Sequence, residues 1–275
     1  MKYNFFVTTL LLHLVATPQT ELREVLAAQN RYFAALPTSL QLLWAKRLTL
    51  KEYARGERVD LSSPNGHVYF PITAVAAQYI VSPGRDEILL RFSGRNTALG
   101  LGGAGVSMPF DYHGVWCCDG HAFTMPKAVV LAALNRPSHQ KSFIDYSQIA
   151  IERLSQMMHC AAAHTLRQRV SRTLLDFYVA QGSDIDEIRL THEEIAKFLN
   201  TRRETVTILV AEWTAQQLIT STRGRINIRD VEGLRHIACS CHANTNSHLE
   251  RALSLWRSQE WSVNNAAPVM FRPQL

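Results

Sequence analysis

The chain has 275 residues, 47% of them hydrophobic and 19% charged, which is the composition of a globular protein and excludes an intrinsically disordered chain. At this length it can hold two domains, each with its own core. The formal net charge of +6 and the pI near 9.2 suit an anionic polymer as a partner, although a local basic face is more informative than the sum.

The amino end begins with Lys2 and an apolar run from Phe5 to Ala16, which resembles the core of a secretion signal. The run is too short to span a bilayer comfortably, two threonines and a histidine interrupt it, and its ending is only a loose cleavage match. We therefore interpret residues 1–30 as an apolar amino-terminal segment. We expect a cytoplasmic protein without membrane association.

The next part of the chain consists of short apolar runs separated by turn residues. The runs span residues 68–72, 75–81, 88–92 and 121–125. Such spacing predicts an antiparallel β-roll, which we assign to residues 31–137.

A glycine-rich stretch, Gly100 to Gly105, satisfies the pattern G-x-G-x-x-G that holds a pyrophosphate in dehydrogenases. No helical run follows it, and no acidic residue ends a convincing second strand about twenty residues later. We interpret these glycines as a corner of the roll. A nucleotide-dependent enzyme is the weaker alternative.

A long helical region from Lys141 to Gln181 lacks Pro and Gly, and we expect a break in it near residues 163–165. An apolar seven-residue repeat runs along it and predicts a partner helix, which we take to belong to a second subunit. The residues assigned to this dimer interface are Ile144, Ile151, Leu154, Met158 and Ala161. A second apolar set, Phe143, Tyr146, Ala150 and Met157, would pack on the chain's own domain.

Two amphipathic helices follow, and each begins with the Thr-x-x-Glu pattern of a capping box, at Thr191 and at Thr201. The apolar positions of the second helix are Val206, Leu209, Val210 and Trp213. We expect only Asn200 to separate the two helices, which must then cross steeply. The outer surface of the second helix would consist of Arg202, Arg203, Thr207 and Ile208, and a DNA major groove accepts a helix presented in this way.

After the second helix, a turn centred on Gly224 and an alternation of Ile226 and Ile228 with polar residues predict a β-hairpin, or wing. Residues 202–229 hold five basic and two acidic residues, so this face is positive and suits phosphates. The basic residues are Arg202, Arg203, Arg223, Arg225 and Arg229.

Three motifs of this region, Leu-Thr-x-x-Glu-Ile-Ala at 190–196, Arg-Glu-Thr-Val at 203–206 and the Gly-Arg-Ile of the wing, resemble the Crp/Fnr family (cAMP receptor protein/fumarate-nitrate regulator) of bacterial transcription factors. The resemblance covers roughly residues 38–238. It implies an α+β protein with an amino-terminal antiparallel β-roll, a long dimerisation helix over 138–164, a winged helix-turn-helix over 165–238 and a tail over 239–275.

By this resemblance, Arg203 would pair with guanine and Glu204 would accept from the cytosine amino group, unless Glu204 only caps its helix. Ile208 stands where the family often has Arg, so a different half-site is expected, with Ile208 against a thymine methyl. Arg202 would hold a phosphate. The remaining residues assigned to DNA binding are Thr191, Thr201, Thr207, Arg223 and Arg225.

The cyclic-nucleotide site of the family holds its phosphate with an arginine, but residues 96–126 contain no Lys or Arg. We therefore predict no tight binding of cAMP through that pocket. The iron–sulfur cluster of the fumarate-nitrate branch is also disfavoured, because residues 1–116 contain no cysteine.

The five cysteines are Cys117, Cys118, Cys160, Cys239 and Cys241, an odd number that favours free thiols in a reducing compartment. The sequence Cys239-Ser-Cys241-His242 resembles part of a metal-binding site. Its two thiolates and one imidazole are one ligand short of tetrahedral coordination, so Cys117, Cys118 or a second subunit would have to supply the fourth ligand. We predict no metal and interpret His159, Cys160 and His164 as structural.

The sequence thus predicts a non-enzymatic, homodimeric transcription regulator that binds a pseudo-palindromic operator in double-stranded DNA. RNA polymerase and an unknown small-molecule effector are further candidate partners. The alternative is a roll-domain sensor that acts mainly through a protein partner.

Overall fold

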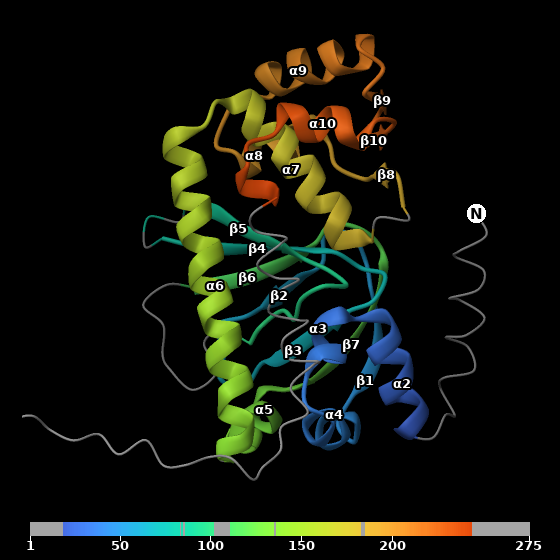
Figure 1. Cartoon of the computed structure of the whole chain (residues 1–275), viewed down its shortest axis with the longest axis vertical. Helices are drawn as coiled ribbons and strands as arrows, with labels where there is room; N and C mark the ends of the chain where they lie inside the picture. Colours follow the sequence, from blue (N-terminus) through green and yellow to red (C-terminus); the bar gives the residue numbers. More distant parts are fainter. Residues whose placement is uncertain are drawn as a thin grey trace, which may run out of the picture.

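The computed structural model describes residues 19–243, except 83, 85, 102–110, 135, 183 and 184. The roll occupies one half of the molecule, a long helix runs along its side, and the carboxyl-terminal helices sit at one end (Figure 1). Predictions for the apolar run near the amino end, for most of the glycine-rich stretch and for the tail beyond residue 243 lie outside the described residues. Among the described helices, none has the length and apolar character needed to cross a membrane.

The roll is built from two antiparallel sheets, as predicted. One sheet has the order β1-β7-β3 and the other β2-β6-β4-β5. The strands are β1 (Thr49–Tyr53), β2 (Arg58–Asp60), β3 (His67–Pro71), β4 (Ala76–Val81), β5 (Glu87–Ser93), β6 (Asp111–Trp116) and β7 (Gly120–Pro126). The four predicted runs correspond to β3, β4, β5 and β7. The sequence analysis missed β1, β2 and β6, whose mostly polar residues do not form an apolar run.

Short helices close the end of the roll: α2 (Gln19–Gln29), α3 (Arg31–Ala35), α4 (Thr38–Ala45) and α5 (Lys127–Leu134). Asn30 links them to the sheet, because its side chain caps α3 at Phe33 N–H (3.0 Å) and donates to the carbonyls of Pro71 and Thr97 (both 3.0 Å). Leu26 of α2 is fully buried in the same core, so the core of the roll includes residues before position 31.

The long helical region is two helices, α6 (Pro137–Ala163) and α7 (Leu166–Gln181), and the predicted break is confirmed. His164 is the C-cap of α6, and Thr165 begins α7 with a capping box that includes Gln168. On the face of α6 toward the roll, Tyr146 is buried and donates its hydroxyl to the carbonyl of Ala98 (3.1 Å).

The carboxyl-terminal unit contains β8 (Glu187–Ile188), α8 (His192–Phe198), α9 (Arg203–Ala215), β9 (Ile219–Thr222), β10 (Arg225–Ile228) and α10 (Val231–Ile237). The predicted wing is confirmed as β9 and β10, and β8 adds a third strand on the other side of β10. Trp213 is fully buried at the centre of this unit. Its apolar cluster continues into the roll through Tyr79 and Phe92, so the two halves share a core.

Candidate DNA-binding interface

Helix α9 has one buried and one exposed face, as the periodicity predicts. Val206, Val210 and Trp213 are at most 2% exposed, whereas Ile208 is 67% exposed. Arg202, Arg203, Glu204 and Thr207 are also exposed. A large aliphatic side chain left in solvent between charged residues is typical of a surface that binds a partner.

The first predicted cap is confirmed. Thr191 and Glu194 form a capping box at the start of α8, in which Glu194 Oε2 accepts from both the N–H (2.7 Å) and the hydroxyl (2.9 Å) of Thr191. The hydroxyl of the half-buried Thr191 is therefore engaged in the cap.

The second predicted cap is wrong. Arg202, without a side-chain cap, is the N-cap of α9, and residues 199–202 rather than Asn200 alone separate the two helices. Asn200 adopts a left-handed backbone (φ 48°), and Thr201 N–H bonds the carbonyl of Ala196 (2.9 Å), which delays the start of α9. The carboxylate of Glu204 is therefore not used in a capping box, and the half-buried Thr201 lies in the turn.

The two helices are joined by a polar contact on their outer side. His192 Nδ1 lies 3.0 Å from Thr207 Oγ1, and the Thr207 hydroxyl also donates to the carbonyl of Arg203 (3.0 Å). Burial, with a contribution from Arg203, lowers the pKa of His192. This contact orients Thr207 next to the exposed arginines.

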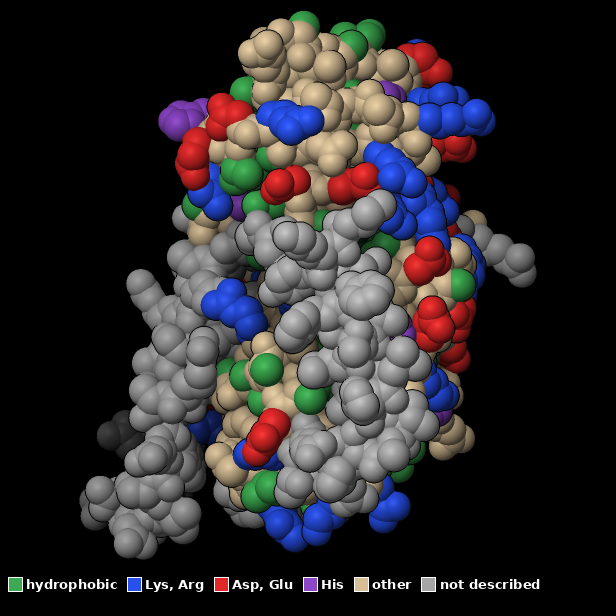
Figure 2. Space-filling model, turned by 90° about the vertical axis from the view of Figure 1, so that its right-hand side faces the viewer, with side chains coloured by type: hydrophobic (Ala, Val, Ile, Leu, Met, Phe, Trp, Pro, Cys, Tyr) green, Lys and Arg blue, Asp and Glu red, His purple; other side chains and the backbone are tan. Residues whose placement is uncertain are grey.

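The wing carries its arginines at the turn. Gly224 has a positive φ of 74°, which a tight hairpin turn requires, and Arg223 and Arg225 on either side of it are exposed. Arg225 also lies 3.3 Å from Glu187 of β8, which reduces the positive charge that it presents. Seen from the side, Lys and Arg side chains lie over the upper part of the molecule with acidic groups among them (Figure 2).

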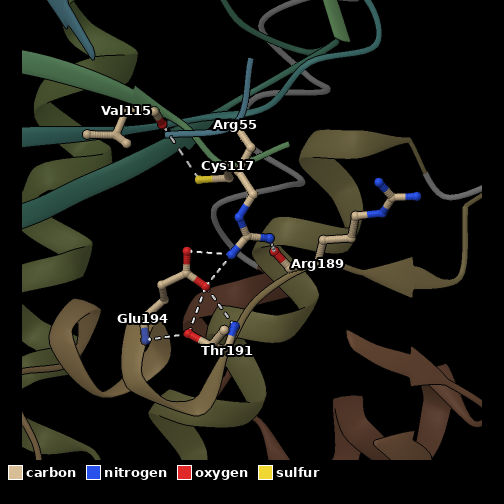
Figure 3. A network of polar contacts seen from close by, with 6 residues as sticks. All are labelled: Arg55, Val115, Cys117, Arg189, Thr191 and Glu194. Carbon is tan, nitrogen blue, oxygen red and sulfur yellow. Dashed lines mark hydrogen bonds and ion pairs between the residues drawn. The ribbon is translucent and has the colours of Figure 1, made fainter. Parts of the chain in front are cut away.

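An arginine of the roll, missed by the sequence analysis, holds α8 in place. Arg55, in the turn after β1, contacts both carboxylate oxygens of Glu194 with its Nη2 (both 2.7 Å) and donates from Nη1 to the carbonyl of Arg189 (2.9 Å; Figure 3). Glu194 is thus shared between the cap of α8 and the roll. The pairing connects residues 139 positions apart, which no local pattern reveals.

A second contact between roll and α8 centres on Glu87 of β5. Its carboxylate binds Lys197 (2.6 Å) and Arg58 (2.9 Å) and lies 3.4 Å from the ring of His113. The hydrogen bond from Lys197 lowers the pKa of Glu87, with Arg58 acting in the same direction. Together with Arg55, these residues fix the helix-turn-helix to the roll at two points.

The residues assigned to the dimer interface lie in one exposed stripe on α6. Ile144 is 57%, Ile151 58%, Leu154 43% and Met158 74% exposed, and Ala161 is exposed as well. Aliphatic side chains in line on the outside of a helix leave an apolar face without a partner among the described residues.

A cleft of about 550 Å³ lies between β5, α6 and α7. Four arginines line it, Arg91, Arg153, Arg169 and Arg172, against the single carboxylate of Asp176. The buried Nε of Arg169 has no hydrogen-bond partner within the described part of the chain. Burial lowers the pKa of Arg153 to about 10, which leaves it cationic at neutral pH. The cleft therefore suits an anion.

The structure corrects the interpretation of the cysteines. The side chains that join Cys239 and Cys241 are Cys160 of α6 and His164, its C-cap, not Cys117 or Cys118. His242 turns away and binds Asp176 instead (2.7 Å). The interpretation of His164 as merely structural missed this cluster, although Cys160 and His164 stand four residues apart and so share a helix face.

The chain therefore combines a β-roll, a long helix with an exposed apolar stripe and a winged helix-turn-helix. Residues 168–237 match a family model described as the Crp-like helix-turn-helix domain. The winged unit is thus a Crp-like helix-turn-helix domain.

Several solved structures share the fold of this chain. A putative regulator of the Crp/Fnr family from Eubacterium rectale has 18% identity and a TM-score of 0.57, with 74% of this chain and 96% of that chain covered. FixK2 from Bradyrhizobium japonicum has 16% identity and a TM-score of 0.57, covering 70% and 98%. A putative cAMP-binding regulatory protein from Silicibacter pomeroyi has 19% identity and a TM-score of 0.57, covering 79% and 99%. Among curated proteins, no significant match is found.

Proposed function

We propose that this protein binds a pseudo-palindromic DNA operator as a homodimer and regulates transcription there in response to a small anionic effector. The observation that carries the proposal is the exposed face of α9, where Arg202, Arg203 and Ile208 stand out from a helix whose opposite face is buried. A helix of this kind enters the major groove with its amino-terminal residues toward the bases. DNA binding also favours a cytoplasmic location.

The exposed residues divide into base-reading and phosphate-binding groups. Arg203 pairs with guanine O6 and N7, and Glu204, which no cap engages, accepts from a cytosine amino group. Ile208 packs against a thymine methyl. Arg202 and the wing residues Arg223 and Arg225 bind phosphates, which position the protein but do not read sequence.

The stripe on α6 provides the dimer interface. Pairing two α6 helices through Ile144, Ile151 and Met158 removes their exposed aliphatic side chains from water. A two-fold dimer then presents two α9 helices to half-sites about 34 Å apart, one turn of DNA. Ile151→Glu places a charge in this interface and is expected to give a folded monomer in analytical ultracentrifugation; a dimer as stable as wild type would refute the assignment.

The effector site is assigned to the arginine-lined cleft, because it joins the roll, α6 and α7. Leu154 and Met158 of the dimer stripe line the same cleft, so binding there and dimer geometry are coupled. An effector would act by favouring the arrangement of the two winged domains that matches the operator. For cAMP, calorimetric titration is expected to show no tight binding through the pocket that the family uses, since residues 96–126 offer no Lys or Arg to its phosphate.

The decisive experiment is selection of bound duplexes from a random pool, followed by affinity measurements on the selected and a scrambled sequence over a salt series. A pseudo-palindrome with half-sites one turn apart supports a dimeric reader. Equal binding to both sequences, with anions such as nucleotides present or absent, would refute sequence-specific recognition.

Two variants separate reading from positioning. Arg203→Ala is expected to cost about 1–3 kcal/mol on the selected site and to relax one base pair. Arg223→Ala is expected to weaken binding to all sequences alike and to reduce the salt slope by about 0.9. Equal losses on every sequence for Arg203→Ala would contradict its assignment to a base.

Ile208 allows a sharper test, because uracil is thymine without its methyl group. Replacing the contacted thymine by uracil is expected to weaken wild-type binding about four-fold, from roughly 0.8 kcal/mol for one buried methyl-sized group. In Ile208→Ala the same replacement is expected to have little effect. An equal effect of uracil on both proteins would exclude a contact between Ile208 and the methyl.

A further inference from the structure

Four side chains that commonly bind metals meet where α6 gives way to α7. Cys160 and His164 come from the end of α6, and Cys239 and Cys241 come from the segment after α10, which returns to this junction (Figure 1). Their ligand atoms all lie within 4.8 Å of one another. Cys160 Sγ is 3.5 Å from Cys239 Sγ, and Cys241 Sγ is 3.6 Å from His164 Nδ1.

The two pair distances match edges of a single coordination tetrahedron, and the four ligand atoms all lie within 4.8 Å of one another. Zinc–sulfur bonds of about 2.3 Å and zinc–nitrogen bonds of about 2.1 Å place two tetrahedral thiolates about 3.8 Å apart and a thiolate and an imidazole nitrogen about 3.6 Å apart, close to the two separations. An iron–sulfur cluster would hold its cysteines farther apart, because its own iron and sulfide atoms lie between them. The arrangement therefore suits one mononuclear ion.

The burial of the cysteines supports a closed, structural type of site. Cys160, Cys239 and Cys241 are 4%, 5% and 2% exposed and form a cluster of their own, separate from the large apolar cores. His164 is half-buried. The three cysteines are free of disulfides. Closed sets of three cysteines and one histidine are among the usual zinc sites that stabilise a fold.

The surroundings hold the ligands in place and supply charge. Asp176 of α7 binds His242, the neighbour of Cys241, at 2.7 Å and also Arg172 at 3.2 Å. The buried Arg172 lies beside the thiol of Cys160. A divalent ion with three thiolates has a net charge of −1, which the guanidinium of Arg172 offsets.

We propose that Cys160, His164, Cys239 and Cys241 bind one zinc ion in a tetrahedral Cys3His site. Binding forms three Zn–S bonds and one Zn–N bond and releases the three thiol protons to water, with no change of oxidation state. The neutral imidazole of His164 coordinates through the nitrogen that faces the thiols.

The metal site would link two parts of the molecule. His164 is the C-cap of α6, so the ion ties the end of the proposed dimerisation helix to the segment that follows the winged unit. Because α7 begins two residues after His164, the ion fixes the angle between α6 and α7. The metal site itself does not depend on DNA binding.

The test starts from the full-length protein, purified without chelators and with a thiol reductant. Elemental analysis is expected to find about one zinc per chain, and cobalt substitution is expected to give the strong visible bands of tetrahedral thiolate coordination. Cys241→Ser and His164→Ala are expected to lose most of the bound zinc. Cys118→Ser is the matched control, a half-buried thiol of the roll outside the cluster, and is expected to keep it.

His164→Cys is the control for misfolding, because it replaces the imidazole by a thiol and keeps four ligands. This variant is expected to retain zinc. Circular dichroism checks that each variant is folded. The proposal is overturned if reduced wild-type protein binds no zinc after zinc is added back, or if Cys241→Ser keeps the zinc of the wild type. A disulfide between Cys160 and Cys239 in reduced, zinc-supplied protein, found by mass spectrometry of unreduced peptides, would also overturn it.

Discussion

Replacing Gly94 by alanine tests how closely the roll must approach α7. Gly94 follows β5, and a Cβ at this position would lie 1.9 Å from the carbonyl oxygen and 2.6 Å from the carbonyl carbon of Ala180. Ordinary contact begins near 3.4 Å, so the end of α7 must move by about 1.5 Å. Both contacting atoms are backbone, and no side chain can rotate away to make room.

The expected cost follows from what this movement breaks. Overpacking of a well-packed site costs about 1–3 kcal/mol. The hydrogen bond from Arg95 N–H to the carbonyl of Ala180 (3.0 Å) adds about 1 kcal/mol when it is lost. The edge-to-face contact of Phe92 with Phe177 (5.1 Å) is also strained. We expect Gly94→Ala to lose about 2–4 kcal/mol of unfolding free energy, or roughly 5–15 °C in melting temperature.

Thermal unfolding followed by circular dichroism measures this loss. Gly84→Ala is the matched control, because its Cβ would be no closer than 3.7 Å to Asp86 and Ser82. We expect it to melt near the wild-type temperature. If Gly94→Ala melted within about 2 °C of wild type, the close approach between the roll and α7 would be refuted.

The remaining predictions concern the junction and the core of the winged unit. The lowered pKa of Glu87 means that its ion pairs stabilise the fold fully above its ordinary pKa of 4.5 and stop doing so as the pH falls through the lowered value. Glu87→Gln is thus expected to lower the free energy of unfolding by about 1–2 kcal/mol at pH 7 and to leave it unchanged in strong acid. The control Asp86→Asn is expected to have the stability of the wild type at both pH values. If denaturant unfolding showed the same loss for Glu87→Gln at every pH, the role of the ion pairs would be contradicted. Trp213→Ala is expected to cost about 3–5 kcal/mol. Trp213→Phe is expected to lower the free energy of unfolding clearly less, because the indole Nε1 has no hydrogen-bond partner among the described residues. Equal losses for the two Trp213 variants would argue against a packing role for the ring.

The sequence predicted the parts of the fold that local patterns encode. The apolar periodicity of α9 and the break between α6 and α7 were visible, because burial repeats with the helix period and capping residues mark the ends. The wing was visible through Gly224 and the alternating isoleucines. The start of α9 was misplaced because Thr201 and Glu204 have the spacing of a capping box, while the left-handed turn at Asn200 sets the true boundary.

Contacts between distant residues were not predictable in the same way. Arg55 and Glu194 are 139 residues apart, and Cys160 and Cys239 are 79 residues apart, so only packing of whole elements brings them together. For the cysteines, that packing is α7 against α10, where the hydroxyl of Ser171 donates to the carbonyl of Leu234 (2.7 Å).

One local signal for the cluster was nevertheless present. Cys160 and His164 stand at i and i+4 on a helix, and Cys239 and Cys241 stand at i and i+2 in a short connection, so each pair presents two ligands to one side. Each pair alone falls short of a tetrahedral set. The two pairs together supply the four ligands of a tetrahedral site. A ligand pair at the end of a helix and a second pair in a later segment therefore indicate that the two segments could meet around one metal ion.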